Sequence, residues 1–282
     1  MSDQVSAVIV CKGRLAHLQQ TLPRLATQPF HDIAVVDYGC PQGTGDWVAA
    51  AFPAVKLVRT PADLPFNLAV GRNLGAAATD APWLFFMDAD TLVAPDFLER
   101  TFERLAPGAF FMAEPLLDDL WGTVFMQRQA FEDVGRYDEV FEGWGGEDAE
   151  LTDRLLDAGL EHRSYDGALA TPLPHSDEMR IQYHVVQERY LNGAINELYR
   201  AAKRDLAKLE MRLDEKERRR LYASIRQGFS TGMPPTHLEL SIRHSESFGL
   251  QWRTVLRYDL AVNRDSPKAP ATWARAPGAK RS

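Results

Sequence analysis

The chain of 282 residues is long enough for one large α/β domain with an appendage, or for two small domains. Apolar residues make up 45% of it, so it can bury a sizeable core, and its net charge of −7 argues against a general nucleic-acid binder. Two cysteines, Cys11 and Cys40, are too few for a disulfide framework or a zinc knuckle. Because no signal-peptide pattern and no apolar run of roughly 18 residues is present, we expect a soluble protein in a reducing cytoplasm.

The first third of the chain alternates short apolar runs with helical patterns. Apolar runs that suit buried strands lie at residues 5–10, 33–36, 54–58 and 83–87. Helical patterns lie between them, at residues 15–25, 47–52 and 67–78. This alternation with short connections predicts an α/β fold with a mostly parallel, doubly wound sheet flanked by helices.

Three carboxylates follow the predicted strands. Asp37 ends the second strand, and Asp88 and Asp90 follow the fourth. Ligands of doubly wound sheets bind at the carboxyl ends of the strands. The sequence therefore predicts that all three carboxylates lie at one rim of the sheet.

The second half of the chain predicts further elements. Residues 95–105 and 147–158 read as helices, and residues 109–113, 123–127 and 161–165 read as strands. From Glu178 onward apolar residues recur at helical spacing, and residues 200–226 form one helix-like stretch with ten Lys/Arg and five Asp/Glu. We expect a helical extension over residues 178–260 and a disordered, Pro- and Ala-rich tail over residues 261–282.

The triplet Asp88-Ala89-Asp90 is the first candidate for chemistry. Two carboxylates one residue apart project to the same side of an extended chain, where they can hold a hard divalent cation. Such a cation can neutralise a departing diphosphate. A DxD triplet is short and is also common in solvated turns, but its position after the run Trp83–Met87 favours the metal interpretation.

The segment from Gly143 to Asp148 is the second candidate. Glycines such as Gly145 let the backbone approach a ligand, and Trp144 offers a flat face for a sugar ring. A carboxylate at Asp148, in the first turn of a helix, could accept a proton from an attacking hydroxyl. The alternative interpretation is a helix cap beside a packed tryptophan.

Several single residues have two interpretations each. His175 is either structural or a ligand that, joined to a DxD, would favour Mn²⁺ over Mg²⁺. Arg72, Lys12 and Arg14 are either surface residues or contacts to a diphosphate. The basic stretch 200–226 is either a solvated face or a contact to an anionic membrane surface.

Taken together, these motifs resemble the GT-A glycosyltransferases of family 2 with a galactosyltransferase-type C-terminal segment. The resemblance runs over residues 5–177, through Val36-Asp37, Gly71–Gly75, Phe86–Asp90, Val134–Glu139 and Phe141–Asp148. It implies a catalytic domain over residues 1–177, with a nucleotide-sugar half at about 1–113 and an acceptor and base half at about 114–177. Two departures from the family pattern, at residues 11–14 and 38–40, affect the expected nucleoside contacts.

The resemblance also implies roles for individual residues. Donor contacts fall to Asp37, Asp88, Arg72, Lys12 and Arg14; sugar contacts to Trp144, Gly145 and Glu147; metal ligation to Asp90, His175 and Asp88; and general base catalysis to Asp148. Because the acidic pair is Glu-Asp rather than Glu-Asn, the resemblance implies an inverting reaction. The implied metal is Mn²⁺, with Mg²⁺ as the alternative.

We therefore interpret the protein as a glycosyltransferase that moves galactose, N-acetylgalactosamine or glucose from a UDP-sugar to the hydroxyl of a glycan, glycolipid or peptide. Two other classes remain open from the sequence. A nucleotidyltransferase-like enzyme would explain the sheet and the DxD triplet but not the Trp-Gly-Gly-Glu-Asp segment. A non-catalytic carbohydrate- or nucleotide-binding module would need no base at Asp148.

Overall fold

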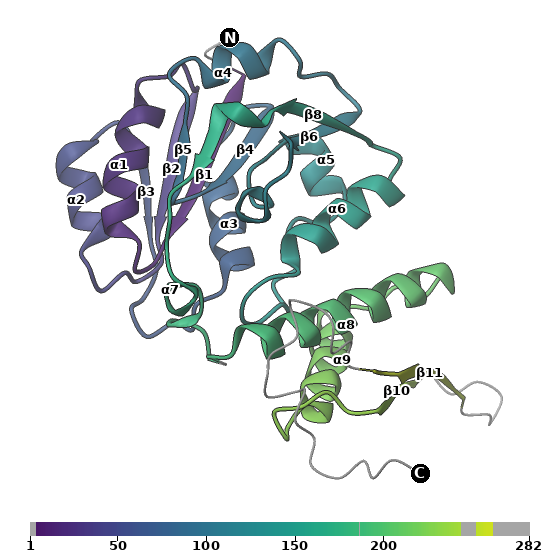
Figure 1. Cartoon of the computed structure of the whole chain (residues 1–282). Helices are drawn as coiled ribbons and strands as arrows, with labels where there is room; N and C mark the ends of the chain where they lie inside the picture. The colour runs from purple at the N-terminus through teal and green to yellow at the C-terminus, as the bar shows by residue number, and fades with distance from the viewer. Residues whose placement is uncertain (1–3, 186, 244–251, 262–282) are drawn as a thin grey trace. The chain divides into compact units, whose positions relative to one another are not determined.

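The computed structural model describes residues 4–185, 187–243 and 252–261 (Figure 1). The chain divides into two compact units, the first made of Met1–Glu139 and Glu147–Val185 and the second of Val140–Gly146 and Val186–Ser282. The expected disordered tail lies outside the described residues, except for residue 261. None of the described helices is long and apolar enough to cross a bilayer.

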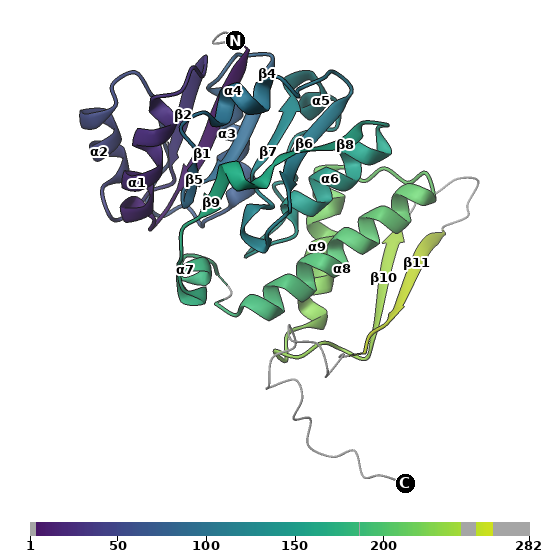
Figure 2. The same cartoon turned by 45° about the horizontal axis from the view of Figure 1, so that its top comes forward.

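A seven-stranded sheet forms the centre of the first unit (Figure 2). Its strands are β1 (Val5–Cys11), β2 (Asp32–Asp37), β3 (Lys56–Arg59), β4 (Trp83–Asp88), β6 (Ala109–Glu114), β7 (Val124–Gln127) and β8 (Glu161–Asp166). They are ordered β3-β2-β1-β4-β7-β6-β8, and only β7 runs antiparallel to its neighbours. The predicted mostly parallel sheet is confirmed.

Helices cover both faces of this sheet (Figure 1). They are α1 (Leu15–Ala26), α2 (Thr44–Ala51) and α4 (Phe97–Phe102) on one face, and α3 (Leu68–Ala77), α5 (Arg128–Asp133) and α6 (Glu147–Asp157) on the other. Alternation along β1 explains the two cores, because Ala7 and Ile9 pack on the first face and Val8 on the second. Gly75 lets α3 lie close to β1, since a Cβ atom there would come within 2.4 Å of the Val8 side chain.

Short elements complete the first unit. They are β5 (Thr91–Val93), β9 (Ala170–Pro172), α7 (Asp177–Ile181) and the 3₁₀ turns η1 (Asp118–Leu120) and η2 (Gly167–Leu169). Strands β5 and β9 pair antiparallel in a small sheet of their own. This pairing ties the segment after Asp90 to the segment before His175.

The second unit contains two helices and a β-hairpin. Its elements are α8 (Arg189–Lys208), α9 (Glu215–Gly228), β10 (His237–Arg243) and β11 (Arg253–Asp259). Tyr199 and Ala202 of α8 pack with Leu221 and Ile225 of α9 in its core. The helical extension is thus accompanied by a hairpin, for which the alternation Leu238, Leu240, Ile242 is the sequence signal.

The prediction of one helix-like stretch over residues 200–226 is wrong. Helix α8 ends at Lys208, and Glu210 has a φ of 57°, which a continuing helix does not allow. Helix α9 starts afresh after Asp214, whose side chain and that of Glu217 form a reciprocal capping box. The Asp-x-x-Glu spacing was the signal for this second start.

Candidate active site

The strand order reverses between β1 and β4. From β1 the chain proceeds outward to β2 and β3, and it then returns to place β4 on the other side of β1. Such a switch point opens a crevice at the carboxyl ends of the two strands. Lys12 follows β1 and Asp88 ends β4, so the predicted rim lies at this switch point.

Asp90 and His175 meet at this rim. The Nε2 atom of His175 lies 3.1 Å from Oδ2 of Asp90, and both side chains are largely buried. The backbone explains this approach, because Leu173 N donates to the Asp90 carbonyl at 2.7 Å next to the β5–β9 pairing. The solvated-turn interpretation of Asp90 is therefore wrong, and the position of His175 shows that residues 85 apart in sequence share one site.

Arg14 is the third member of this group. Its Nη1 atom lies 3.3 Å from Oδ2 of Asp90 and is buried without a hydrogen bond among the described residues. The pKa of Asp90 is lowered: burial acts to raise it, but the hydrogen bond from His175 and the charge of Arg14 outweigh burial. An ionised oxygen donor beside an imidazole nitrogen suits a divalent transition ion, so the residues present fit the implied metal.

Arg72 of α3 connects the two halves of the first unit. Its guanidinium lies 3.0 Å from Asp88 Oδ1 of β4, 2.5 Å from Asp148 Oδ1 and 3.5 Å from Glu147 Oε1 at the start of α6. Only 1% of Arg72 is exposed, so the surface interpretation of this residue is wrong. A buried guanidinium needs such partners, and here they hold carboxylates from distant segments together.

Two further residues complete this cluster. Tyr137 places its ring 5.0 Å from the Arg72 guanidinium, and its hydroxyl donates to Asp148 Oδ1 at 3.1 Å. At Gly122 a Cβ atom would come within 2.1 Å of Arg72 Nη2 and 2.8 Å of Asp88 Oδ2. The sequence patterns indicated no role for either residue. A role for Tyr137 could have been predicted, because it lies in the motif Val134–Glu139. No local sequence pattern marks Gly122.

Burial sets the protonation of the acids in this cluster. Burial, and next the charge of Asp148, raises the pKa of Glu147 to about 8 against the opposing effect of Arg72. Burial also raises the pKa of Asp88 to about 6, with Arg72 opposing and Asp90 adding to the shift. Glu147 therefore holds a proton at neutral pH, next to Asp148.

A cavity of about 510 Å³ opens beside the rim. Lys12, the loop Gly39–Pro41 and Phe66 line it, and residues 182–185 close it. His184 in that closing segment is buried, and burial lowers its pKa to about 4, so its ring is neutral at pH 7. The cavity combines aromatic and apolar walls with few polar groups, as small-molecule sites do.

Asp37 holds the loop that forms one wall of this cavity. Its two carboxylate oxygens accept hydrogen bonds from the backbone N–H groups of Cys40, at 2.8 Å, and Gly45, at 3.0 Å. Asp37 thus fixes the loop between β2 and α2. Its predicted contact to the nucleoside stays a prediction.

Trp144 and Gly145 belong to the second unit. The Asn196 side chain of α8 donates to the carbonyl oxygens of Glu142, Trp144 and Gly145, and the Arg189 guanidinium lies 4.3 Å from the Trp144 ring centroid. The loop is thus anchored within its own unit. The predicted sugar contacts of Trp144 and Gly145 stay predictions.

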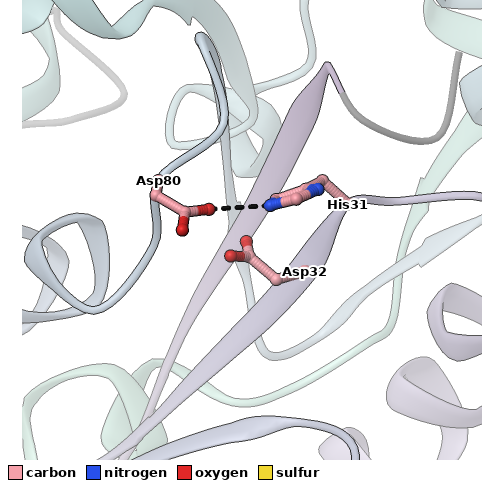
Figure 3. Close-up of side chains that lie close together, drawn as sticks. All are labelled: His31, Asp32 and Asp80. Atoms are coloured by element: carbon pink, nitrogen blue, oxygen red, sulfur yellow. Dashed lines mark hydrogen bonds and ion pairs between the residues drawn. The ribbon is translucent and has the colours of Figure 1, made fainter.

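A second histidine and carboxylate cluster lies at the opposite edge of the sheet (Figure 3). His31 Nε2 is 2.7 Å from Asp80 Oδ1, and Asp32 at the start of β2 is 2.7 Å from Lys56 Nζ. Among the described residues this is the one group whose ligand atoms all lie within 4.8 Å, which Asp88, Asp90 and His175 do not satisfy together. Lys56 already supplies a cation there, so we interpret the cluster as an ion-pair network that joins β2, β3 and the segment before β4.

Comparisons with known proteins agree with this arrangement. Residues 6–115 match the model of glycosyl transferase family 2, and residues 118–177 match the model described as the N-terminal domain of galactosyltransferase. These two matches confirm the resemblance to family 2 glycosyltransferases with a galactosyltransferase-like segment. A search of curated proteins found no significant match.

Solved structures show the same fold. The mannosyltransferase PcManGT from Pyrobaculum calidifontis, in complex with GDP-Man and Mn²⁺, is similar with a TM-score of 0.55 and 15% identity over 81% of this chain and 75% of that chain. TarS 1–349 from S. aureus, in complex with UDP, is similar with a TM-score of 0.54 and 13% identity over 80% of this chain and 72% of that one. At these identities the likeness establishes the GT-A fold.

Proposed function

We propose that the protein is an inverting, metal-dependent glycosyltransferase that moves a hexose from a UDP-sugar to an acceptor hydroxyl. The observation that carries this proposal is the buried Arg72, which joins Asp88 of the sheet rim to Asp148 of α6. A DxD strand end and a helix N-terminal carboxylate would then serve one reaction centre. The hexose would be galactose, N-acetylgalactosamine or glucose, and the match to a galactosyltransferase segment supports a galactose-type donor.

Asp148 would act as the general base. Among the described residues, the hydrogen bonds to its carboxylate, from Arg72 and Tyr137, both fall on Oδ1. This orients the carboxylate and leaves Oδ2 to take the proton of the acceptor hydroxyl as it attacks the anomeric carbon. Glu147, which holds a proton at neutral pH, would bind a sugar hydroxyl rather than compete as the base.

Asp90, His175 and Asp88 would hold the metal. The approach of His175 Nε2 to Asp90 Oδ2 supports a mixed nitrogen and oxygen site, for which Mn²⁺ is the better match than Mg²⁺. The Mn²⁺ in the PcManGT complex supports the same ion. When bound, the ion would offset the charge of the departing nucleoside diphosphate. Arg14, beside Asp90, and Lys12, at the mouth of the cavity, would contact the diphosphate.

The cavity beside the rim would take the nucleoside. Its size and aromatic walls suit a base and a ribose, and Asp37 fixes the loop that lines it. The UDP in the TarS complex supports a uridine nucleotide, while the GDP-Man in the PcManGT complex defines the competing donor to be tested. The acceptor would be a glycan, glycolipid or peptide, bound with the help of Trp144 and Gly145.

The basic residues of 200–226 carry a separate, weaker proposal. Exposed Arg219 and Arg220 on α9 could contact an anionic membrane surface, although Arg219 is paired with Glu215. Retention of the protein on vesicles with anionic lipid at low salt would support this contact. Failure of such vesicles to retain it would leave these residues as a solvated face.

Nucleotide release from a panel of UDP-sugars and GDP-mannose tests the proposed function. Slow hydrolysis of the correct donor is expected with Mn²⁺, and it should be lost with EDTA and in Asp90→Ala. Asp80→Ala, which removes a carboxylate from the opposite cluster, is the matched control and should keep the activity. Release that is unaffected by EDTA and by Asp90→Ala would overturn the metal assignment, and binding of no nucleotide sugar would overturn the donor assignment.

A further inference from the structure

The two cysteines of the sequence lie together next to the cavity. Cys11 ends β1, and its register partner Asp37 ends β2, three residues before Cys40. Thr44 lies beside both thiols, with its Oγ1 atom 3.4 Å from Cys11 Sγ, and the two cysteines shift each other's pKa. Nothing in the proposed transfer reaction uses either thiol.

The two thiols differ in access. Cys40 lines the cavity and is 9% exposed, whereas Cys11 is completely buried. The backbone N–H of Gly13 donates to Cys40 Sγ at 3.1 Å. A sulfur that faces a cavity and accepts hydrogen bonds has the surroundings of a reactive cysteine, whereas a sulfur with the burial of Cys11 can be reached only by its neighbour.

The pKa values of the two thiols differ in the same way as their access. The hydrogen bond from Cys11 lowers the pKa of Cys40 to about 5, helped by Thr44 and by the Gly13 N–H and against the effect of burial. The hydrogen bond to Cys40, together with burial, raises the pKa of Cys11. Cys40 therefore carries the negative charge at neutral pH, and Cys11 carries the proton.

We propose that Cys40 and Cys11 form an oxidisable thiol pair, in which Cys40 reacts with a hydroperoxide and Cys11 then closes an intramolecular disulfide. In the first step Cys40 Sγ attacks the peroxide oxygen, the O–O bond breaks, the alcohol or water leaves, and Cys40 becomes a sulfenic acid. In the second step Cys11 Sγ attacks Cys40 Sγ, the S–O bond breaks and water leaves. The two thiols are oxidised by two electrons and the hydroperoxide is reduced by two.

Oxidation would change the shape of the donor site, because Cys40 belongs to the loop 38–43 that lines the cavity. This consequence rests on the proposed function. Cys40 lines the cavity with Gly39 and Pro41, and its backbone N–H is held by Asp37. Drawing Cys40 Sγ onto Cys11 moves it from the cavity wall toward β1. We expect the oxidised protein to bind UDP severalfold more weakly, and dithiothreitol to restore binding.

Mass spectrometry of the intact full chain tests the thiol chemistry without any activity measurement. The protein is treated with hydrogen peroxide near stoichiometry, the peroxide is removed, and the protein is then unfolded and labelled with N-ethylmaleimide. We expect a monomer that has lost two hydrogens and takes up no maleimide, reversed by dithiothreitol. Uptake of two maleimides after peroxide treatment, or a covalent dimer as the product, would overturn the proposal.

Single variants assign the two roles. In Cys11→Ala the sulfenic acid on Cys40 has no resolving thiol, so dimedone should trap it. In Cys40→Ala we expect no dimedone adduct, and Cys11 should stay unlabelled until the protein is unfolded. Dimedone trapping on Cys11 instead of Cys40 would overturn the assignment. If a variant does not fold, the wild-type mass measurement still decides whether the disulfide forms.

A protection measurement separates this proposal from the proposed function. With UDP and Mn²⁺ at about ten times the dissociation constant, alkylation of Cys40 by iodoacetamide should slow about tenfold. Disulfide formation without protection by UDP would leave the thiol pair standing and overturn the nucleotide assignment of the cavity. Protection by UDP without disulfide formation would do the reverse.

Discussion

The two acidic clusters of the first unit lie at opposite ends of the same strands and use the same types of side chain. At the carboxyl rim, Asp88 and Asp148 contact the buried Arg72, and Asp90 contacts His175. At the other end of the strands, Asp80 pairs with His31, and Asp32 lies beside them (Figure 3). Asp32 is also paired with Lys56. The side chain of Asp80 is 72% exposed and that of Asp90 only 14%.

The His175–Asp90 pair at the rim is therefore buried, whereas the His31–Asp80 pair at the other end of the strands is exposed to solvent. In water a histidine and carboxylate pair contributes little and changes protonation easily. At the rim, burial raises the pKa values of Glu147 and Asp88. The pKa of Asp90 falls, because His175 and Arg14 stabilise its charged form against the effect of burial. Neighbouring carboxyl groups whose pKa values are shifted in opposite directions are characteristic of catalytic sites.

The largest expected effect is on turnover in Asp148→Asn. The amide keeps the shape of the carboxylate but cannot accept the acceptor proton, so kcat should fall ~10²–10⁴-fold with little change in the KM of the donor. Steady-state transfer or donor hydrolysis measures this. Asp80→Asn makes the same chemical change at the opposite edge and should leave kcat unaltered; equal losses in both variants would erase the distinction between the clusters.

The next largest effect is on stability in Arg72→Met. Removal of the guanidinium leaves the buried Glu147 and the partly buried Asp88 and Asp148 without this cation, which should cost ~3 kcal/mol of unfolding free energy. Urea denaturation measures this cost. The paired variant at the opposite cluster is His31→Gln, which removes the exposed ion pair with Asp80 and should cost under ~1 kcal/mol. A small loss in Arg72→Met would show that the cluster is more hydrated than its burial indicates.

The pH dependence of stability should change in Glu147→Gln. The pKa of Glu147 is about 8 in the folded protein and ~4.5 in the unfolded chain. The folded state therefore holds a proton that the unfolded state releases, and stability falls as pH rises between these two values. Glutamine cannot ionise, so the stability of the variant relative to the wild type should increase by more than ~1 kcal/mol from pH 4.5 to pH 8. A constant difference across this range would contradict the raised pKa.

The smallest effect concerns Asp80→Asn. The hydrogen bond from His31 lowers the pKa of Asp80 in the folded protein, so its stabilising contribution is present above the unfolded pKa and is lost as the pH falls. The difference in melting temperature between wild type and variant should be slight at pH 7 and should shrink as the pH falls below the unfolded pKa of ~3.9. A large difference at any pH would mean that this edge carries more than an ion-pair network.

Much of the fold could be predicted because several strands are short, almost entirely apolar runs, two of which end in aspartates. The runs 5–10, 33–36 and 83–87 lie in β1, β2 and β4, and Asp37 and Asp88 are the last residues of β2 and β4. A parallel sheet then brings strand ends together without further information. The proximity of His175 to Asp90 came from the family resemblance rather than from any local pattern.

The parts that the sequence did not predict depend on contacts between distant residues. Arg72 lies in an Ala-rich helix, and nothing nearby indicates that it would be buried between β4 and α6. Cys11 and Cys40 read as two isolated thiols, because their meeting depends on the register of β1 with β2. The capping box at Asp214, by contrast, was a readable local signal that the charge pattern of residues 200–226 obscured.

Mn²⁺-dependent binding of UDP tests the central claim most directly, because it compares the two clusters in one titration. Calorimetry on the wild type, Asp90→Ala, His175→Ala and Asp80→Ala would measure UDP affinity with Mn²⁺ and with EDTA. The account predicts that Mn²⁺ strengthens UDP binding in the wild type and in Asp80→Ala, and that the gain disappears in Asp90→Ala and His175→Ala. Loss of the gain in Asp80→Ala, with its retention in Asp90→Ala, would contradict the account and place the metal at the opposite edge of the sheet.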